Sequence, residues 1–484
     1  MDDVAVPPAA STTTDGTQTG HGLRGSIGVV GIVFLVVAAA APLTAIGGAL
    51  PVMLAAGNGP GNPMSFVVAT VVLLLFSVGY AAMSRHVVDA GAFYAYITRG
   101  LGDRLGTGAA GLALLGYTAI QAAVYGLAGA TAQGLAVQHL GLDLPWWVWS
   151  LLLLVLVGLL GYRNIDVGTK VLGVVLTLEV AVVTVMAVAV LVQGGADGLD
   201  LQPFTLGAFF DGAPGISIMF AIASFVGFEA TAIYGEEARD PQRTVPRATY
   251  AAVVLIGAFY AFASWAVVMA LGTDQAAAAA QADPSAGLIF GIATQYVGTP
   301  LTDAMGALLL TSLFAALLAF HNAIARYLFS LGRQGRVPAS LATSHPRHGS
   351  PARGSLVQTV CALVLMSLFV AAGADPILQV FTWASGVATV SVLVLLVLTS
   401  VAVLAFFHRE RLDTRTWHTR VAPALGTVAL VAVLALVLTN FTTLISGSAG
   451  LATVLLALVA AVFVGGVVVA GVQGRTPIAG GHRR

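Results

Sequence analysis

Two glutamates stand inside long apolar runs of this sequence, where an ionised side chain has no bulk water to solvate it. Glu179 lies in VVLTLEVAVVT and Glu229 in MFAIASFVGFEATAIYGEE. A carboxylate in such surroundings must be protonated, paired across helices or open to a water-filled cavity. We therefore interpret Glu179 as a candidate proton-coupling or cation-binding acid. The alternative is a structural acid that is hydrogen-bonded within a helical bundle.

Two of the apolar runs also contain residues that weaken helices. The first run reads AAAAPLTAIGGALP, in which Pro42 is followed by Gly47 and Gly48, and the later run carries Gly227 two residues before Glu229. In lipid, irregular backbone persists only where protein, water or a ligand satisfies its polar groups. The two interruptions therefore indicate a binding site, and the alternative is that small residues here only permit close helix packing.

A broken helix presents opposite partial charges at its two inner ends. In the first run, the outer half-helix would start near Ala45 to Gly47 and direct its free N–H groups, helped by the Thr44 hydroxyl, at a carboxylate. In the later run, the outer half would end near Ala223 to Val226 and leave carbonyl groups to accept from an ammonium. A zwitterion would satisfy both ends at once.

Three further polar side chains are candidates for the same site. Glu229 follows the second break, where it would lie at an inner gate or anchor the inner half of its helix. Tyr117 and Gln121 are four residues apart, which places them on one face of a helix. These two side chains would line the pocket or bond neighbouring helices.

The elements that must position these residues are predicted to be membrane helices. The chain of 484 residues is 58% hydrophobic and 9% charged, which is too little polar surface to cover a water-soluble globule. A membrane helix needs roughly 20 apolar residues. Twelve runs qualify, with approximate limits 27–55, 64–84, 107–138, 146–162, 170–192, 214–235, 249–271, 300–331, 355–373, 377–405, 421–443 and 450–472. The sequence therefore predicts an all-α membrane protein with twelve transmembrane helices.

The charges predict how this protein is oriented. With the amino terminus in the cytoplasm, all 21 Lys and Arg residues fall on the cytoplasmic side, while the outer loops carry aspartates instead. We therefore expect a multi-pass protein of the cytoplasmic (inner or plasma) membrane, with both termini in the cytoplasm. Residues 1–25, rich in Thr, Ala, Gly and Pro, are expected to form a disordered tail. Residues 473–484 would form a second cytoplasmic tail.

The two interrupted runs are the first and the sixth. This placement is what a five-plus-five inverted repeat predicts, with repeats at about 26–193 and 212–405 and a transporter core at 26–405. The third and eighth runs, which would correspond under the same scheme, are both about 32 residues long and would tilt strongly.

Several longer motifs are similar to those of one transporter superfamily. SFVGFEA (224–230) and GEEARDPQRTVPRA (235–248) resemble the sixth span and following loop of the amino acid-polyamine-organocation (APC) superfamily. DAGAFYAYITRGLG (89–102) resembles its loop after span 2, and HNAIARYLFSLGRQGRVP (321–338) the end of its eighth span. The resemblance implies the leucine-transporter fold with broken helices 1 and 6, and with the last two spans, within 406–472, peripheral.

The resemblance also implies positions for the substrate contacts. The family's carboxylate-binding amides fall on Ala45, Ile46 and Gly47, and its ammonium-binding carbonyls on Pro42, Ala223 and Val226. This chain departs from the family pattern at two positions. Many members have Gly-Ser-Gly or Gly-x-Gly at the first break, where this chain has PLTAIGG. Some proton-coupled members have a Lys midway along span 5, where this chain has Glu179. The candidate substrate-binding residues are Pro42, Thr44, Ala45, Ile46, Gly47, Tyr117, Gln121, Ala223, Ser224, Val226 and Gly227. The coupling or gating candidates are Glu179 and Glu229.

The function that these features predict is proton-coupled secondary active transport of an amino acid across the cytoplasmic membrane by alternating access. The resemblance implies that spans 1, 2, 6 and 7 move against the rest. The expected partners are the small-molecule substrate, the lipid bilayer and a coupling proton or sodium ion. An amine or polyamine transporter and an amino acid exchanger remain alternatives. A channel is disfavoured because no re-entrant filter sequence occurs. A major-facilitator transporter is disfavoured because GLGDRLG (100–106) matches that class only faintly. No metal cluster, nucleophile motif or phosphate loop indicates an enzyme, a cofactor or nucleic-acid binding.

Overall fold

The computed structural model describes residues 27–87, 92–163, 169–229, 231, 238–343, 345, 351–445 and 449–472. The two predicted tails lie outside these ranges, as do residues 89–91, 230 and 235–237 of the family-like motifs. The described residues are helical apart from loops and one isolated bridge between Ile27 and Ala238.

The helical elements follow one another along the chain with short connections. They are α1 (Val29–Ala40), α2 (Pro42–Thr44), η1 (Ala45–Ala49), α3 (Leu50–Ala56), η2 (Gly59–Gly61), α4 (Asn62–Met83), α5 (Ala92–Leu101), α6 (Asp103–Leu140), α7 (Trp146–Tyr162), α8 (Thr169–Val192), η3 (Gln202–Phe204), α9 (Leu206–Phe210), α10 (Pro214–Ala223), α12 (Pro241–Leu271), α13 (Ala276–Ala282), α14 (Ala286–Tyr296), α15 (Thr299–Arg333), η5 (Ala339–Ala342), α16 (Ala352–Ala371), η6 (Pro376–Phe381), α17 (Thr382–Glu410), η7 (Trp417–Val421), α18 (Ala422–Leu444) and α19 (Ala449–Val472).

Many of these helices have the length and composition of membrane spans. Among the described residues, nine helices are long and apolar enough to cross a bilayer, and three shorter apolar helices are Pro42–Ala56, Trp146–Tyr162 and Pro214–Ala223. Two of the short ones are the outer parts of the interrupted first and sixth runs. The molecule is therefore an all-helical, multi-pass membrane protein.

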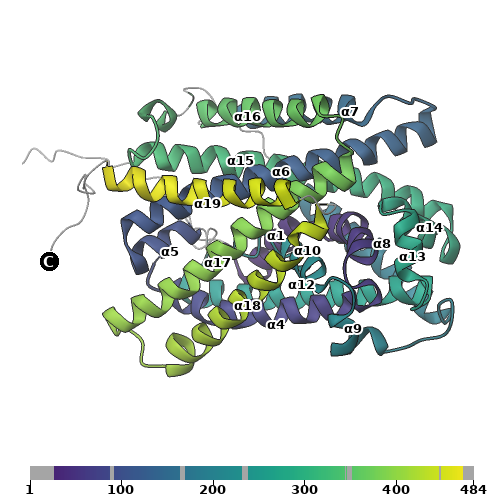
Figure 1. Cartoon of the computed structure of the whole chain (residues 1–484), viewed down its shortest axis with the longest axis horizontal. Helices are drawn as coiled ribbons and strands as arrows, with labels where there is room; N and C mark the ends of the chain where they lie inside the picture. Colours follow the sequence, from purple (N-terminus) through teal and green to yellow (C-terminus); the bar gives the residue numbers. More distant parts are fainter. Residues whose placement is uncertain are drawn as a thin grey trace, which may run out of the picture.

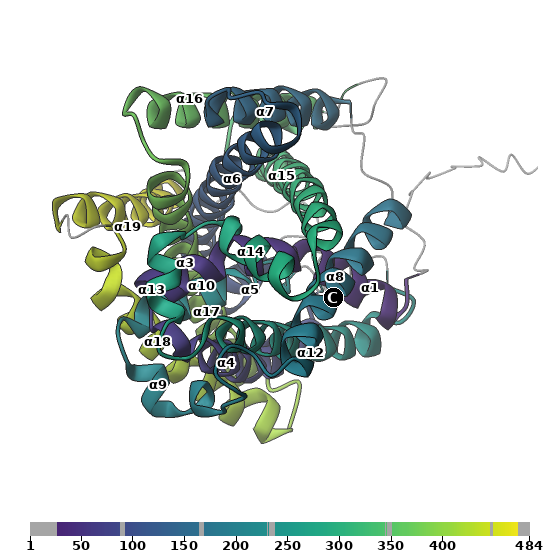
Figure 2. The same ribbon diagram turned by 90° about the vertical axis from the view of Figure 1, so that its right-hand side faces the viewer.

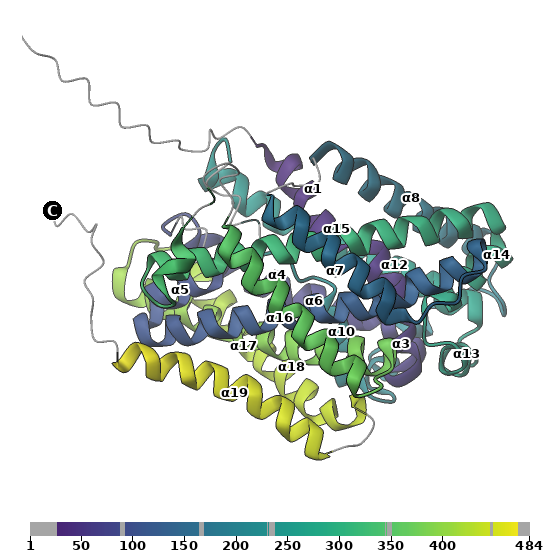
Figure 3. The same ribbon diagram turned by 90° about the horizontal axis from the view of Figure 1, so that it is seen from above.

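The interrupted helices lie in the middle of the bundle. Figure 2 shows α1, α3 and α10 between α6 and α15 on one side and α4 and α12 on the other. The short helix α5 lies at one end of the long helices, and α13 and α14 lie at the opposite end (Figures 1 and 3). Helix α19 runs along the edge of the bundle, and only 11% of its most apolar 18-residue stretch is buried. Any site formed by the interrupted helices is therefore enclosed by the longest spans.

The two walls α6 and α15 are longer than a bilayer requires. They contain 38 and 35 residues. At 1.5 Å of rise per residue, each helix is roughly 50–60 Å long, whereas the hydrocarbon core is only about 30 Å thick. Such helices must tilt or extend beyond the core, which agrees with the lengths predicted for the third and eighth runs.

Candidate functional site

The first helix breaks at Ala41. Helix α1 ends at Ala40, Ala41 adopts a left-handed conformation with φ 46° and ψ 72°, and α2 begins at Pro42. Proline disfavours the helical conformation in the residue before it and is favoured at the first position of a helix. The outer half-helix therefore starts at Pro42, about one turn earlier than the Ala45 to Gly47 start that the glycine pair suggested.

Gly48 lies at a close contact between helices. A Cβ at Gly48 would lie 2.5 Å from the Cδ2 atom of Leu127 on α6, whereas a Cβ at Gly47 would lie at an ordinary contact distance, 3.4 Å, from the Cδ2 atom of Leu309 on α15. Ala45–Ala49 forms a π-helical turn, a feature that is common at functional sites. The expectation that the outer half-helix starts near Ala45 to Gly47 was wrong, because this half-helix already starts at Pro42.

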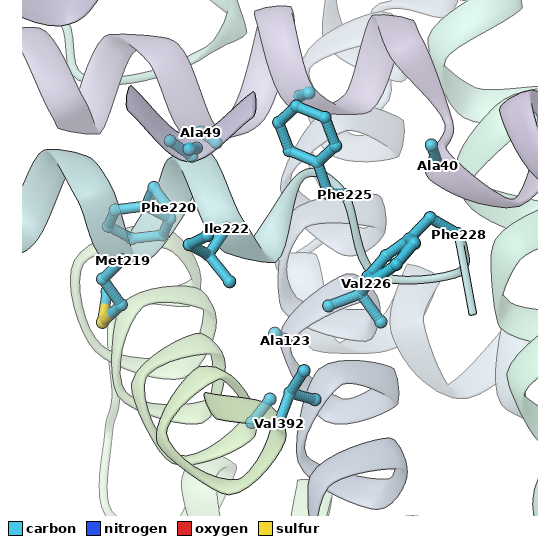
Figure 4. Packing of buried hydrophobic residues seen from close by; sticks show 14 of the residues in the cluster. Ala40, Ala49, Ala123, Met219, Phe220, Ile222, Phe225, Val226, Phe228 and Val392 are labelled. Carbon is cyan, nitrogen blue, oxygen red and sulfur yellow. The ribbon is translucent and has the colours of Figure 1, made fainter. Parts of the chain in front are cut away.

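The second interruption lies where the sequence predicted it. Helix α10 ends at Ala223, the N–H groups of Phe225 and Val226 bond back to Ile222 and Ala223, and Gly227 has φ 111°. Figure 4 shows the ribbon losing its coil beyond Ile222 and continuing as an irregular segment that carries Phe225, Val226 and Phe228. Only glycine adopts the Gly227 conformation at little cost, so this residue allows the chain to leave the helix.

A cavity lies between the two breaks. Its lining residues come from both interrupted helices and from α6, α15 and the start of the tenth run, and they are Ala40, Ala41, Thr44, Ala45, Ala49, Ile120, Val124, Phe220, Ala223, Ser224, Val226, Ala316, Phe320, Phe381 and Ser385. None of these side chains is charged, and the only polar ones are three hydroxyls. The cavity thus suits a guest with an apolar body.

Two of the three hydroxyls are poised to bond a guest. The Ser224 hydroxyl already donates to the Phe220 carbonyl at 2.8 Å. The Thr44 and Ser385 hydroxyls are buried and have no hydrogen-bond partner among the described residues. Burying an unpaired hydroxyl is unfavourable by about 1–3 kcal/mol, so a polar ligand in this cavity would gain by bonding either of them.

Helix ends supply the cavity's electrostatic character. The carboxyl ends of α1 at Ala40 and of α10 at Ala223 carry partial negative charge, while the amino end of the helix that starts at Pro42 carries partial positive charge. Ala40 and Ala223 line the cavity, and so does Thr44 in the first turn after Pro42. The arrangement can bind an ammonium and a carboxylate without any charged side chain.

Glu179 lies beside the first break. Its side chain is buried, its Oε2 atom accepts from the Leu43 N–H at 3.4 Å, and it accepts from the Ser312 hydroxyl of α15. Leu43 belongs to the first turn of the outer half-helix, where N–H groups lack partners within the helix. The carboxylate of the fifth run therefore caps this half-helix and connects it to the eighth.

Glu229 forms a separate cluster at the second break. Its Oε2 atom accepts from the Gly227 N–H at 2.8 Å, and its Oε1 atom accepts from the Tyr117 hydroxyl at 3.2 Å. The Tyr80 hydroxyl of α4 donates to the Glu229 backbone carbonyl at 3.0 Å. The acid thus joins α4 and α6 to the irregular segment beyond α10.

The structure brings five of the predicted substrate-binding residues to the cavity. They are Thr44, Ala45, Ala223, Ser224 and Val226. Pro42, Ile46, Gly47, Tyr117, Gln121 and Gly227 are absent from its lining. The Pro42 carbonyl, expected to accept from an ammonium, instead accepts from the Ala45 N–H within the helix, and Ala40 supplies the carbonyl at the break.

Sequence reasoning missed most of the cavity wall. Phe220 and Phe381 both line it, with ring centroids 5.8 Å apart and planes at 19°, and Phe320 and Ala316 come from α15. Apolar residues such as these are common in every membrane helix, so nothing in their types distinguished them. The spacing of four between Phe381 and Ser385 is one signal that could have found the contribution of the tenth run.

Comparison with known proteins agrees with this geometry. A family model described as amino acid permease matches residues 31–473, nearly the whole chain. The chain belongs to the amino acid permease family. This places it among transporters of the APC superfamily.

Individual relatives of this permease are distant. The branched-chain amino acid permease BcaP of Lactococcus lactis subsp. cremoris is 27% identical over 334 residues, which cover 64% of this chain and 69% of the relative. BcaP of Bacillus subtilis is 25% identical over 60% of this chain and 64% of its own length. The aromatic amino acid transport protein AroP of Escherichia coli is 25% identical over 66% of this chain and 72% of its own length. The chain thus spans about two thirds of the length of these relatives.

Gln121 illustrates a buried polar residue whose contacts lie outside the cavity. Its Nε2 atom donates to the Leu317 carbonyl of α15 at 3.1 Å, and its Oε1 atom accepts from Gln358 of α16. We expect Gln121→Leu to destabilise the permease by about 1–3 kcal/mol, because the Gln358 amide is left unpaired. The substrate KM should stay unchanged. Thermal unfolding in detergent and uptake kinetics measure the two effects.

The double variant Gln121→Leu, Gln358→Leu is the control, since removing both partners should recover part of the lost stability. A large rise in KM for Gln121→Leu with unchanged stability would instead assign this side chain to substrate binding.

Proposed function

We propose that this permease is a secondary transporter that carries a neutral, apolar amino acid across the cytoplasmic membrane by alternating access. The observation that carries the proposal is the cavity between the two helix breaks, which combines an uncharged lining with helix ends of both polarities. The ammonium would bind near the carbonyl groups at the two breaks, that of Ala40 at the first and those of Ala223 and Ser224 at the second. The carboxylate would bind at the start of the outer half-helix, with the Thr44 hydroxyl.

The lining determines which side chains the cavity accepts. A charged substrate side chain would lose its hydration against Ile120, Phe220, Phe320 and Phe381 without gaining a partner of opposite charge. Branched-chain and aromatic side chains would instead gain about 25 cal/mol for each Å² of apolar surface that they bury. The names of two relatives, a branched-chain amino acid permease and an aromatic amino acid transport protein, support the same class.

The amine or polyamine alternative lacks support in the cavity. A polyamine carries several cationic groups, which carboxylate side chains would be expected to stabilise. The cavity lining contains no carboxylate, and an amine without a carboxyl group would leave the buried Thr44 hydroxyl without an anionic partner. An exchanger would use the same cavity and differs only in its coupling.

We infer twelve spans with both termini in the cytoplasm and the five-plus-five inverted repeat of the leucine-transporter fold. The nine long and three shorter apolar helices among the described residues support the count, and the breaks in the first and sixth runs support the repeat. The one-sided distribution of Lys and Arg supports the orientation. The peripheral position of α19 fits a core formed by the first ten spans.

The two buried acids would then have different roles. Glu179 caps the outer half of the first span and touches α15, so its protonation would change a contact between a broken helix and its wall. We propose it as the proton-coupling group. Glu229, held by Gly227 and Tyr117 at the second break, would act as a gate below the cavity.

The test of this function is uptake into proteoliposomes from a panel of radiolabelled substrates, with and without a pH or sodium gradient. We expect leucine, valine or phenylalanine to enter at least about tenfold faster than lysine, glutamate or putrescine, and a proton gradient to drive accumulation. Liposomes without protein are the control. Rapid entry of putrescine with no entry of any amino acid would contradict the proposal.

A further inference from the structure

We propose that Tyr260 is a positioning residue for substrate binding, whose single hydroxyl holds the carbonyl groups at both helix breaks in the orientation that receives the substrate ammonium. The inference rests on the proposed function and extends it to a residue on the seventh run that does not line the cavity. Tyr260 lies in the middle of α12 and its side chain is fully buried.

The hydroxyl contacts one carbonyl from each interrupted helix. Its oxygen lies 3.1 Å from the Ala40 carbonyl oxygen and 3.3 Å from the Ser224 carbonyl oxygen. Ala40 is the last residue of α1 and Ser224 the first residue beyond α10, so both carbonyls lie at negatively polarised helix ends. A tyrosine hydroxyl has one hydrogen to donate, which two acceptors must share.

Both acceptor residues face the cavity. Ala40 and Ser224 are among its lining residues. A backbone carbonyl has two lone pairs, so each oxygen can accept from Tyr260 and from a second donor at the same time. An ammonium offers three donors. The substrate ammonium would thus donate to the lone pairs of the Ala40 and Ser224 carbonyl oxygens that Tyr260 leaves free.

Ring contacts fix where the hydroxyl points. The Tyr260 ring lies 5.2 Å from Phe66 of α4 and 6.0 Å from Phe225 of the irregular segment, edge to face with the latter. These contacts come from the second run and from the second break. The side chain therefore links four of the runs, the first, second, sixth and seventh, which the resemblance predicts to move together. One hydrogen bond donor can keep the two breaks aligned during that movement.

The experiment compares wild type with Tyr260→Phe in proteoliposomes, using leucine uptake and competition by the 2-hydroxy acid that has the leucine side chain but no ammonium. In wild type, leucine should compete much better than the hydroxy acid. In Tyr260→Phe, we expect the leucine KM to rise about tenfold with Vmax within about twofold, and the ratio of the two inhibition constants to shrink by about tenfold. The carbonyls would no longer be held for the ammonium.

A structural role alone gives a different result. If Tyr260 only stabilises the fold, Tyr260→Phe should weaken both compounds equally or lower the amount of protein without changing the ratio, and either result overturns the proposal. Tyr125→Phe is the matched control, because this equally buried tyrosine on α6 lies outside the contact and its loss of a hydroxyl should leave the ratio unchanged.

A second variant keeps the test decisive if Tyr260→Phe does not reach the membrane. Phe225→Leu keeps the hydroxyl but removes one ring that orients it, and should shrink the ratio by about threefold; an unchanged ratio would count against the proposal. Failure of wild type to take up any amino acid would contradict the proposed function itself, which separates that outcome from a failure of the Tyr260 role.

Discussion

Glu179→Gln should abolish proton-driven accumulation of substrate while sparing exchange. The glutamine carbonyl oxygen can still accept from the Leu43 N–H, and its amide group can still bond Ser312, so the half-helix keeps its cap. What the variant loses is the ability to bind and release a proton. A gradient of one pH unit stores about 1.4 kcal/mol per proton, enough for about tenfold accumulation.

The measurement uses proteoliposomes with a gradient of one pH unit. We expect accumulation in Glu179→Gln to fall about tenfold, to the equilibrium level, with substrate counterflow within about threefold of wild type. Glu179→Ala is the control for the cap, since it removes the contact with Leu43 and should slow both modes. Undiminished accumulation in Glu179→Gln under the same gradient would show that the proton binds elsewhere.

Glu229→Gln provides the comparison between the two acids. The glutamine oxygen can replace the acceptor for the Gly227 N–H, but the NH2 group cannot accept from the Tyr117 hydroxyl. Because we propose Glu229 as a gate for both modes of transport, Glu229→Gln should slow accumulation and counterflow together.

The helical architecture was predictable because the bilayer imposes strong rules. Apolar runs of about 20 residues must be helices, and their positions in the sequence agree with the helices from α1 to α19. The second break was predictable for a similar reason, since Gly227 is followed by an acid that needs a partner. Its N–H group bonds that acid, Glu229.

The first break was harder to locate from sequence. Pro42 and the Gly47, Gly48 pair both weaken a helix, and nothing local says which of them interrupts it. The answer depends on neighbours far along the chain, because Leu127 occupies the space that a side chain at Gly48 would need. Glycine in a membrane helix therefore indicates either a break or a close contact, and only the packing partner distinguishes them.

The cavity wall and the role of Tyr260 were beyond sequence reasoning altogether. Tyr260 lies 220 residues from Ala40 along the chain and 36 from Ser224. Which helix faces bring these groups together is set by tertiary packing, and a tyrosine within an apolar run carries no sign of its partners. Apolar helices could thus be located from local composition, whereas the contacts that orient the carbonyl groups could not.

Gly227→Ala should reduce uptake about tenfold or more. With φ at 111°, Gly227 occupies a conformation that costs a residue with a Cβ about 1–3 kcal/mol. Two movements could relieve the strain. The Gly227 N–H could move away from Glu229, which would disturb the gate. Alternatively, the segment could become more helical, which would turn the Ser224 carbonyl away from the cavity. Initial rates of uptake per inserted protein measure the loss, with thermal unfolding recorded in parallel.

Gly134→Ala is the matched control for this substitution. Gly134 lies within α6 with no atom within 4 Å of an added Cβ, and alanine is favoured over glycine in a helix by about 1 kcal/mol. Its uptake should equal that of wild type and its thermal stability should match or exceed it. Equal uptake by Gly227→Ala and Gly134→Ala would mean that the irregular segment tolerates a change in backbone conformation, and the second break would then lose its proposed role in binding the ammonium.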